Sequence, residues 1–282
     1  MLFRSVVWLA FGKLAQNYTM GLQTLNETVS RRSRKAGERR WLDALVEVPP
    51  LRWWLRDPVE RASFVLAAAY MLRDRDVKLR IYPGIAPMMI IPFIFMLPAT
   101  GSAGDSGFGI ALAGGYLGLI PLLGISLLQY SQQWQASDIF RAAPIFGPGP
   151  LCRGARRAVL CLLTVPAVAA VALFAAVVVP EKARLLTLLP GIIAIPIFAL
   201  MANLGGKGVP LSLPNEEAKS AGRALLMIAI IPISLALSGL TSWAWSAGLF
   251  WQFIGVEVLV VIAVHAVLSR SIERATWPAQ TD

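Results

Sequence analysis

Long apolar runs follow one another along the chain after residue 80. One of them, Phe108–Leu128, contains no charged residue. About 20 apolar residues, at 1.5 Å rise each, match the hydrocarbon thickness of a bilayer, whereas a core helix of a soluble domain keeps a polar face. The pattern predicts an all-α integral membrane protein with six spans, at Ile81–Thr100, Phe108–Leu128, Ala158–Val179, Leu185–Asn203, Ala224–Thr241 and Gly248–Leu268.

The segment before the first span has apolar stretches that are too short to cross a bilayer. Apolar residues at helical spacing predict an amphipathic helix over Phe3–Leu14. Asp57-Pro58, with Glu60 three residues after Asp57, is typical of a helix start with a capping box. The apolar run behind it, Ser63–Leu72, is short. We therefore predict that residues 1–80 form a basic, amphipathic segment in the cytoplasm or at the membrane interface.

Two features of this segment favour contact with the membrane surface. Ser30–Arg40 is a run rich in arginine, which is expected to lie near anionic lipid as a solvated linker. Trp53-Trp54 is flanked by Arg52 and Arg56, and indole rings favour the depth of the lipid headgroups. The tryptophan pair is therefore predicted to be an interfacial anchor.

Prolines recur inside the predicted spans, and the first span contains Pro83, Pro87, Pro92 and Pro98. An interior proline breaks a helix in water, but neighbouring groups in a membrane bundle can satisfy the freed carbonyls. The other spans are predicted to be kinked helices, and the first leaves open a broken or re-entrant segment.

The cationic side chains gather on one side of the predicted topology. Of the 26 Lys and Arg residues, all but Lys182 and Arg184 precede the first span, lie in the loops before the third and fifth spans, or follow the sixth. Because Lys and Arg accumulate on the cytoplasmic side of membrane proteins, both termini, the loop 129–157 and a tail at 269–282 are predicted to be cytoplasmic. This placement accounts for the net charge of +10 without a nucleic-acid partner.

Motifs of enzymatic chemistry are missing from the sequence. Cys152 and Cys161 form neither a disulfide framework nor a zinc motif. Gly205–Gly208 lacks the spacing and the hydroxyl residue of a phosphate-binding loop, and the chain has one histidine. We predict a protein that is not an enzyme, has no cofactor or metal site, and has membrane lipid among its partners.

Four residues inside the spans are singled out by their type. Glu257 lies near the middle of the sixth span, where a carboxylate is costly and often faces a cavity or a partner. His265 lies about 80° further round the same helix. The pair is either a proton or substrate contact, or a hydrogen-bonded carboxyl group with a histidine at headgroup depth. Gly114 and Gly118 present a small face at which another helix can approach closely.

The loop 129–157 is the most informative polar segment. Ser131–Ala143 mixes apolar and polar residues in the manner of a short amphipathic helix, and Pro144 and Gly147–Pro150 interrupt it. Such a helix, lying across the cytoplasmic ends of the spans, either receives force from a soluble partner or merely covers the bundle.

Three segments resemble the permease subunits of ABC-2-type exporters, in particular the membrane proteins of bacterial ABC exporters. They are Arg73–Pro83 at the first span, Tyr130–Pro144 after the second, and Val209–Ser212 before the fifth. The resemblance covers roughly residue 51 to the C-terminus.

The resemblance implies a protein of the bacterial cytoplasmic (inner) membrane that is powered by an ATPase encoded on a separate chain. The coupling helix that contacts the ATPase would be Ser131–Pro144, with the candidate contact residues Trp134, Asp138, Ile139, Phe140 and Arg141. The resemblance also implies a homodimer or a heterodimer with another permease chain. Two features differ from the family pattern: the loop after the fifth span is short, and the N-terminal segment is long.

Two alternatives stay open from the residues alone. One is a proton-coupled secondary transporter in which Glu257 carries the proton. The other is a membrane scaffold that does not transport and recruits partners through its basic N-terminal segment.

Overall fold

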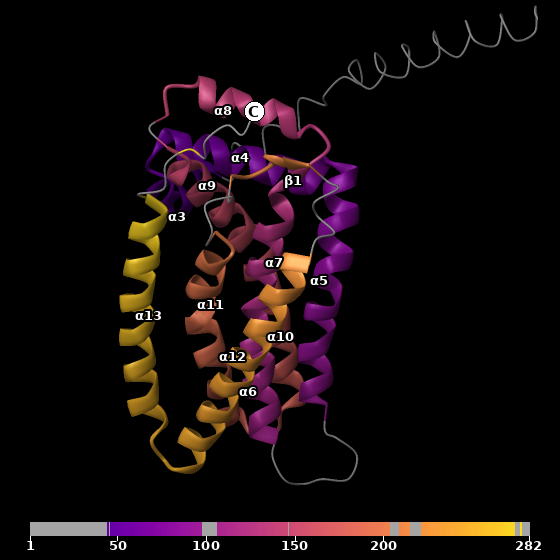
Figure 1. Cartoon of the computed structure of the whole chain (residues 1–282). Coiled ribbons are helices and arrows are strands. Elements are labelled where there is room, and N and C mark those ends of the chain that lie inside the picture. Colours follow the sequence, from indigo (N-terminus) through magenta and orange to yellow (C-terminus); the bar gives the residue numbers. More distant parts are fainter. Residues whose placement is uncertain are drawn as a thin grey trace, which may run out of the picture. The chain divides into compact units, whose positions relative to one another are not determined.

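The computed structural model describes residues 44, 46–97, 106–145, 147–203, 209–214, 221–273 and 277. The predicted helix Phe3–Leu14, the basic run Ser30–Arg40 and most of the predicted tail lie outside these residues. The part described from Val46 onward is almost entirely helical (Figure 1).

The helices and two very short strands follow the chain in a simple order. They are α3 (Pro49–Trp54), α4 (Pro58–Arg73), α5 (Arg75–Met96), α6 (Ser106–Leu117), α7 (Leu119–Leu128), β1 (Tyr130–Ser131), η1 (Trp134–Ser137), α8 (Asp138–Ala142), α9 (Gly149–Val159), the π-turn η2 (Leu160–Thr164), α10 (Val165–Val178), η3 (Lys182–Leu188), α11 (Leu189–Met201), β2 (Leu213–Pro214), α12 (Ala221–Ser246) and α13 (Phe250–Glu273).

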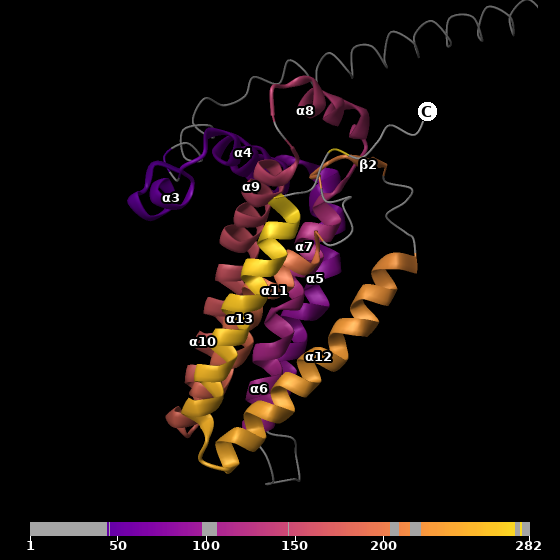
Figure 2. The same cartoon turned by 60° about the vertical axis from the view of Figure 1, so that its left-hand side comes forward.

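Among the described residues, five stretches of helix are long and apolar enough to cross a membrane. They are Arg75–Met96, Gly107–Leu128, Gly149–Val178, Lys182–Met201 and Phe250–Glu273. The prediction of an all-α protein with several helices of membrane-spanning length is therefore confirmed. The helices stand side by side in a bundle, and α12 is inclined to the others (Figure 2).

Two of the helices differ from the sequence prediction, one in its continuity and one in its start. The first span is one continuous helix, α5, although Pro83, Pro87 and Pro92 lie inside it, so it is neither broken nor re-entrant between Arg75 and Met96. The helix that contains the third predicted span begins at Gly149, nine residues before Ala158, and Pro150 occupies its first turn, where the missing N–H of proline costs nothing.

The helix α6 forms the centre of the bundle, and its glycines set the distances to its neighbours. A side chain at Gly109 would overlap the backbone of Phe95 on α5. At Gly115, a Cβ atom would lie 3.1 Å from the carbonyl oxygen of Ser234 on α12, and Ser234 donates a hydrogen bond to the Gly115 carbonyl. Small residues let helix backbones approach closely where lipid supplies no hydrophobic driving force.

One end of the bundle carries most of the described cationic side chains. At this end, which we call the basic end, α5 and α9 begin and α13 ends, and α4 lies across it with α3 and α8 nearby (Figure 1). Asp57 caps α4 as predicted: its carboxylate accepts a 2.8 Å hydrogen bond from the Val59 N–H. The α4 helix packs chiefly against α9, and the residues that join the two helices form part of the candidate site.

Candidate functional site

The start of α5, the strand β1 after α7 and the segment 209–214 meet at the basic end. Arg80, on the first turns of α5, donates a 2.7 Å hydrogen bond from Nη1 to the carbonyl oxygen of Tyr130. Tyr130 in turn pairs with Leu213 in the two-residue parallel ladder of β1 and β2. Side-chain and backbone contacts thus join the start of the first span, the end of the second and the approach to α12.

The segment 209–214 is held against the end of α7 by its backbone. The N–H of Leu211 donates to Leu128 O and that of Leu213 to Gln129 O, both at 3.0 Å. The Gln129 amide also donates to Ala202 O, at the end of α11. Leu211 is buried and adopts φ 61°, a left-handed conformation that disfavours side chains with a Cβ atom. These contacts fix the point from which the chain leaves α7.

The residues Trp134–Ala142 then form a short protrusion, which we call the α8 segment, made of η1 and α8. Trp134 is 40% exposed and Ile139 is 69% exposed. Asp138 and Arg141 are also exposed, and Phe140 is half-buried. Five candidate residues from the sequence therefore lie on one short stretch of the surface, where two large apolar side chains stand beside charged ones. Such a composition suits a protein contact better than a solvated loop.

A charged cluster that the sequence did not reveal joins α4 to α9 and α13. Glu60 on α4 is buried, and its carboxylate forms ion pairs with Arg153 and Arg157 on α9. Arg153 also pairs with Glu273 at the end of α13, with 3.0 Å between Nη1 and Oε1. We call these four residues the Glu60 cluster. The local pattern predicted that Glu60 would belong to a capping box, but its partners lie far away in sequence.

The backbones of α4 and α9 also approach each other closely. A side chain at Gly154 would overlap the carbonyl oxygen of Glu60 and the Cβ atom of Ser63. The Ser63 hydroxyl donates a 2.6 Å hydrogen bond to Leu151 O. The available sequence signal was the four-residue spacing of Arg153 and Arg157, which places both on one helix face once α9 begins at Gly149.

The cluster extends to α3 through one tryptophan. Arg157 donates from Nη1 to Trp54 O at 2.6 Å, and its guanidinium lies over the Trp54 ring, 5.2 Å from the centroid. A guanidinium over an indole face is a favourable cation–π arrangement. The helices α3 and α4 are therefore both fastened to the start of the third span.

Glu257 and His265 lie apart in the structure. Glu257 is 8% exposed on α13, and both of its carboxylate oxygens are buried without a hydrogen-bond partner among the described residues. His265 is half-buried, two turns further along the helix, which is about 12 Å at 1.5 Å per residue. Glu257 therefore stands as a single buried carboxyl group rather than as half of a pair.

The two glycines that were singled out for helix packing lie against α11 and the turn before it. A Cβ atom at Gly114 would meet Leu188 O at 3.0 Å, and one at Gly118 would overlap the Phe198 ring. Within the part of the chain that the structure describes, no three His, Cys, Asp or Glu side chains are grouped so that they could hold a metal ion.

Comparisons of the chain with family models, with curated proteins and with solved structures gave no match.

Proposed function

We propose that this protein is the membrane-spanning subunit of an ATP-driven exporter of the ABC-2 type, and that a separate ATPase chain drives it by binding the α8 segment. The observation that carries the proposal is the exposure of Trp134 and Ile139 on a protrusion that connects the second and third apolar helices. The resemblance of the three segments that meet at its base supports the same assignment.

The proposal includes six spans, with α12 as the fifth in chain order. The α12 helix contains the uncharged run Ala224–Thr241, and Ser234, Ser238 and Thr241 are buried. Six crossings put the basic end and both termini in the cytoplasm of a bacterial cell, following the excess of Lys and Arg there. The chain would lie in the inner membrane and act as a homodimer or with a second permease chain.

The connections of the α8 segment suggest how ATP hydrolysis would reach the bundle. The segment follows α7 through β1, and only Ala143–Pro148 separate it from the N-terminus of α9. Displacement of α8 by a moving ATPase would therefore pull on α9. The Glu60 cluster would pass the same movement to α4 and to the end of α13. Packed helices with two discrete arrangements are the usual carriers of such coupling.

Replacing the apolar side chains of the α8 segment tests the proposal. We expect Trp134→Ala combined with Ile139→Ala to lower the ATPase activity that purifies with the tagged full-length protein by about tenfold, since buried aromatic and aliphatic anchors dominate the affinity of protein interfaces. The measurement is ATP hydrolysis in the eluate of membranes from the native host, relative to the amount of tagged protein.

A matched control removes similar side chains at the other end of the bundle. Trp243 and Leu249 are 60% and 43% exposed near the turn between α12 and α13, and their double alanine variant should retain the wild-type ATPase activity. Wild-type eluate without ATP hydrolysis, or equal activity with both double variants, would contradict the assignment.

A second candidate function, a proton-coupled secondary transporter, is favoured by the unpartnered carboxyl group of Glu257. It predicts that proteoliposomes containing the protein conduct protons down a pH gradient without ATP, and that Glu257→Gln abolishes this flux. The exporter proposal predicts no such flux from either protein. A pH-sensitive dye inside the vesicles distinguishes the two.

The same residue gives a prediction about stability. We expect Glu257→Met to stabilise the protein by about 1–3 kcal/mol, because the substitution removes two buried oxygen atoms that lack partners and keeps a similar volume. Thermal unfolding of the purified full-length protein measures the effect. A lower unfolding temperature would mean that Glu257 has a partner, for example on a second chain.

A further inference from the structure

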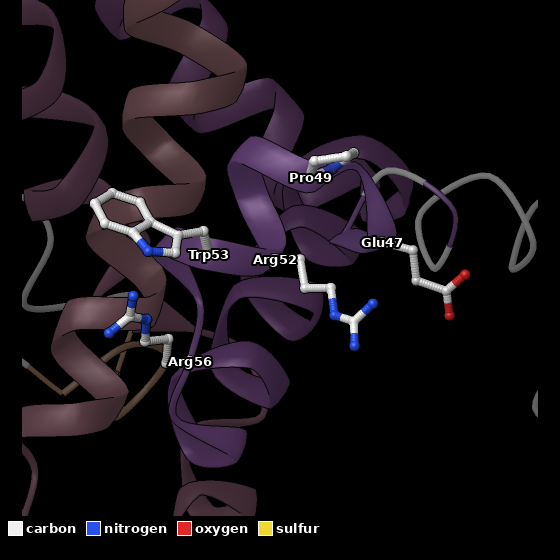
Figure 3. Close-up of a pocket in the computed structure, with 5 residues that line it drawn as sticks. All are labelled: Glu47, Pro49, Arg52, Trp53 and Arg56. Carbon is white, nitrogen blue, oxygen red and sulfur yellow. The ribbon is translucent and has the colours of Figure 1, made fainter.

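A shallow pocket of about 390 Å³ lies beside α3, lined by Glu47, Pro49, Arg52, Trp53 and Arg56. Its volume falls within the range of about 300–1,000 Å³ that is common for sites of small ligands. Figure 3 shows the Arg56 guanidinium next to the Trp53 ring, with Arg52 between this pair and Glu47. The pocket therefore combines two cations and an aromatic face within the five residues from Arg52 to Arg56.

The charges of the pocket favour an anion. No ion pair involves Arg52 or Arg56 in the part of the chain that the structure describes. The Glu47 carboxylate also lines the pocket, with its Oε1 3.8 Å from Nη2 of Arg61, and the two arginines leave the pocket with a net positive charge. Arg56 lies over the Trp53 ring, 5.1 Å from the centroid, so the ring holds the guanidinium in place. Oriented guanidinium groups bind phosphate through two parallel N–H donors.

The position of the pocket favours a lipid over a soluble anion. Trp53 is 71% exposed, whereas Val46 and Leu55 on either side of it are buried. The contact of Arg157 with Trp54 holds α3 at the end of the apolar helix that begins at Gly149. Tryptophan at this depth places its ring among lipid headgroups and upper acyl chains. An amphipathic ligand could contact both the two arginines and the Trp53 ring.

We propose that this pocket binds the headgroup phosphate of an anionic phospholipid, with Arg52 and Arg56 contacting the phosphate and Trp53 contacting the glycerol and the first part of an acyl chain. The ATPase assignment plays no part in this proposal, which depends only on α3 lying at a membrane surface. The bound lipid would hold α3, and through Arg157 the start of the third span, at a fixed depth.

Native mass spectrometry of the detergent-purified full-length chain tests the proposal. Phosphatidylglycerol and phosphatidylcholine are added in turn, and the fraction of protein that retains lipid is measured. We expect Arg52→Gln with Arg56→Gln to lower the retention of phosphatidylglycerol by about tenfold or more, because a hydrogen bond between two charged groups contributes about tenfold or more in affinity. Retention of phosphatidylcholine should be low in both proteins.

The matched control is Arg75→Gln with Lys78→Gln, which removes two positive charges at the same end of the bundle but outside the pocket. This variant should retain phosphatidylglycerol as the wild type does. Arg52→Lys with Arg56→Lys keeps the charge without the two parallel donors, and should give an intermediate loss. Thermal unfolding of each variant checks that it folds, which the exposure of Arg52 and Arg56 favours.

Three outcomes would overturn the proposal. Equal loss in the pocket variant and the control would mean that general charge, rather than the pocket, attracts lipid. Equal retention of the two lipids by the wild type would exclude recognition of an anionic headgroup. Displacement of phosphatidylglycerol by millimolar inorganic phosphate would assign the pocket to a soluble anion.

Discussion

Replacing Gly191 with alanine is expected to destabilise the protein by about 3 kcal/mol, the upper part of the range for overpacking a closely packed interior. Gly191 lies in the first turn of α11, and a Cβ atom there would overlap the backbone of Gly114 and Gly115 on α6. A side chain could rotate away from such an overlap, but a backbone cannot. The two helices would have to separate, at the centre of the bundle.

The measurement is the temperature of thermal unfolding of the purified full-length protein, with a loss of about 5–10 °C expected. Gly239 on α12 supplies the control, because a Cβ atom there would meet no other atom within 4 Å. Gly239→Ala should be neutral or stabilise by up to about 1 kcal/mol, since alanine is the better helix former. If both variants unfold at the wild-type temperature, the helices α6 and α11 do not approach as closely as described.

The positions of the apolar helices could be predicted, because the signal lies within each run. Phe108–Leu128 falls within the helical stretch Gly107–Leu128, which is interrupted at Gly118 between α6 and α7, since an uncharged run of this length has few alternatives. The ends of the helices were harder to predict, because hydropathy depends on the side chains, whereas a helix is defined by its backbone. The helix α9 continues through Arg153 and Arg157 to Gly149, and the partner that compensates those charges is Glu60, far away in sequence.

The sequence could not predict that α5 is a continuous helix, for a related reason. Each of its internal prolines removes one backbone hydrogen bond, and whether the helix survives depends on its neighbours. Pro92 is buried, and Phe93 beside it packs edge-to-face on Phe174 of α10, with 4.8 Å between ring centroids. Such support from a distant helix leaves no pattern in the local sequence.

The residues of the α8 segment could be selected from the sequence, but the base on which it stands could not. Tyr130 and Leu213 pair in strands of only two residues each, and nothing in either dipeptide indicates the other. The hydrogen bond from Arg80 to Tyr130 likewise joins segments separated by two apolar helices. Only the structure shows that the start of α5, β1 and the segment 209–214 are in contact.

The second large effect is expected at Glu60. We predict that Glu60→Ala destabilises the protein by about 3 kcal/mol, because it leaves Arg153 and Arg157 without their shared partner in a largely buried site. The loss is at the lower end of the range for broken buried ion pairs, since both guanidinium groups keep some contact with solvent. The measurement combines thermal unfolding with hydrogen exchange of the amides of α4 (Pro58–Arg73), which should lose protection first as α4 separates from α9.

An exposed ion pair provides the control for Glu60. Glu181 pairs with Arg184 at 2.6 Å on the surface, and Glu181→Ala should change stability by no more than about 0.5 kcal/mol, because solvent screens such pairs. Glu60→Leu combined with Arg157→Leu should recover part of the loss, since apolar side chains replace a buried pair and Arg153 keeps Glu273. Unchanged exchange in α4 of the Glu60→Ala protein would mean that Ser63, Gly154 and the apolar contacts hold α4 on α9 without the Glu60 cluster. Movement of α9 would then reach α4 through packing alone.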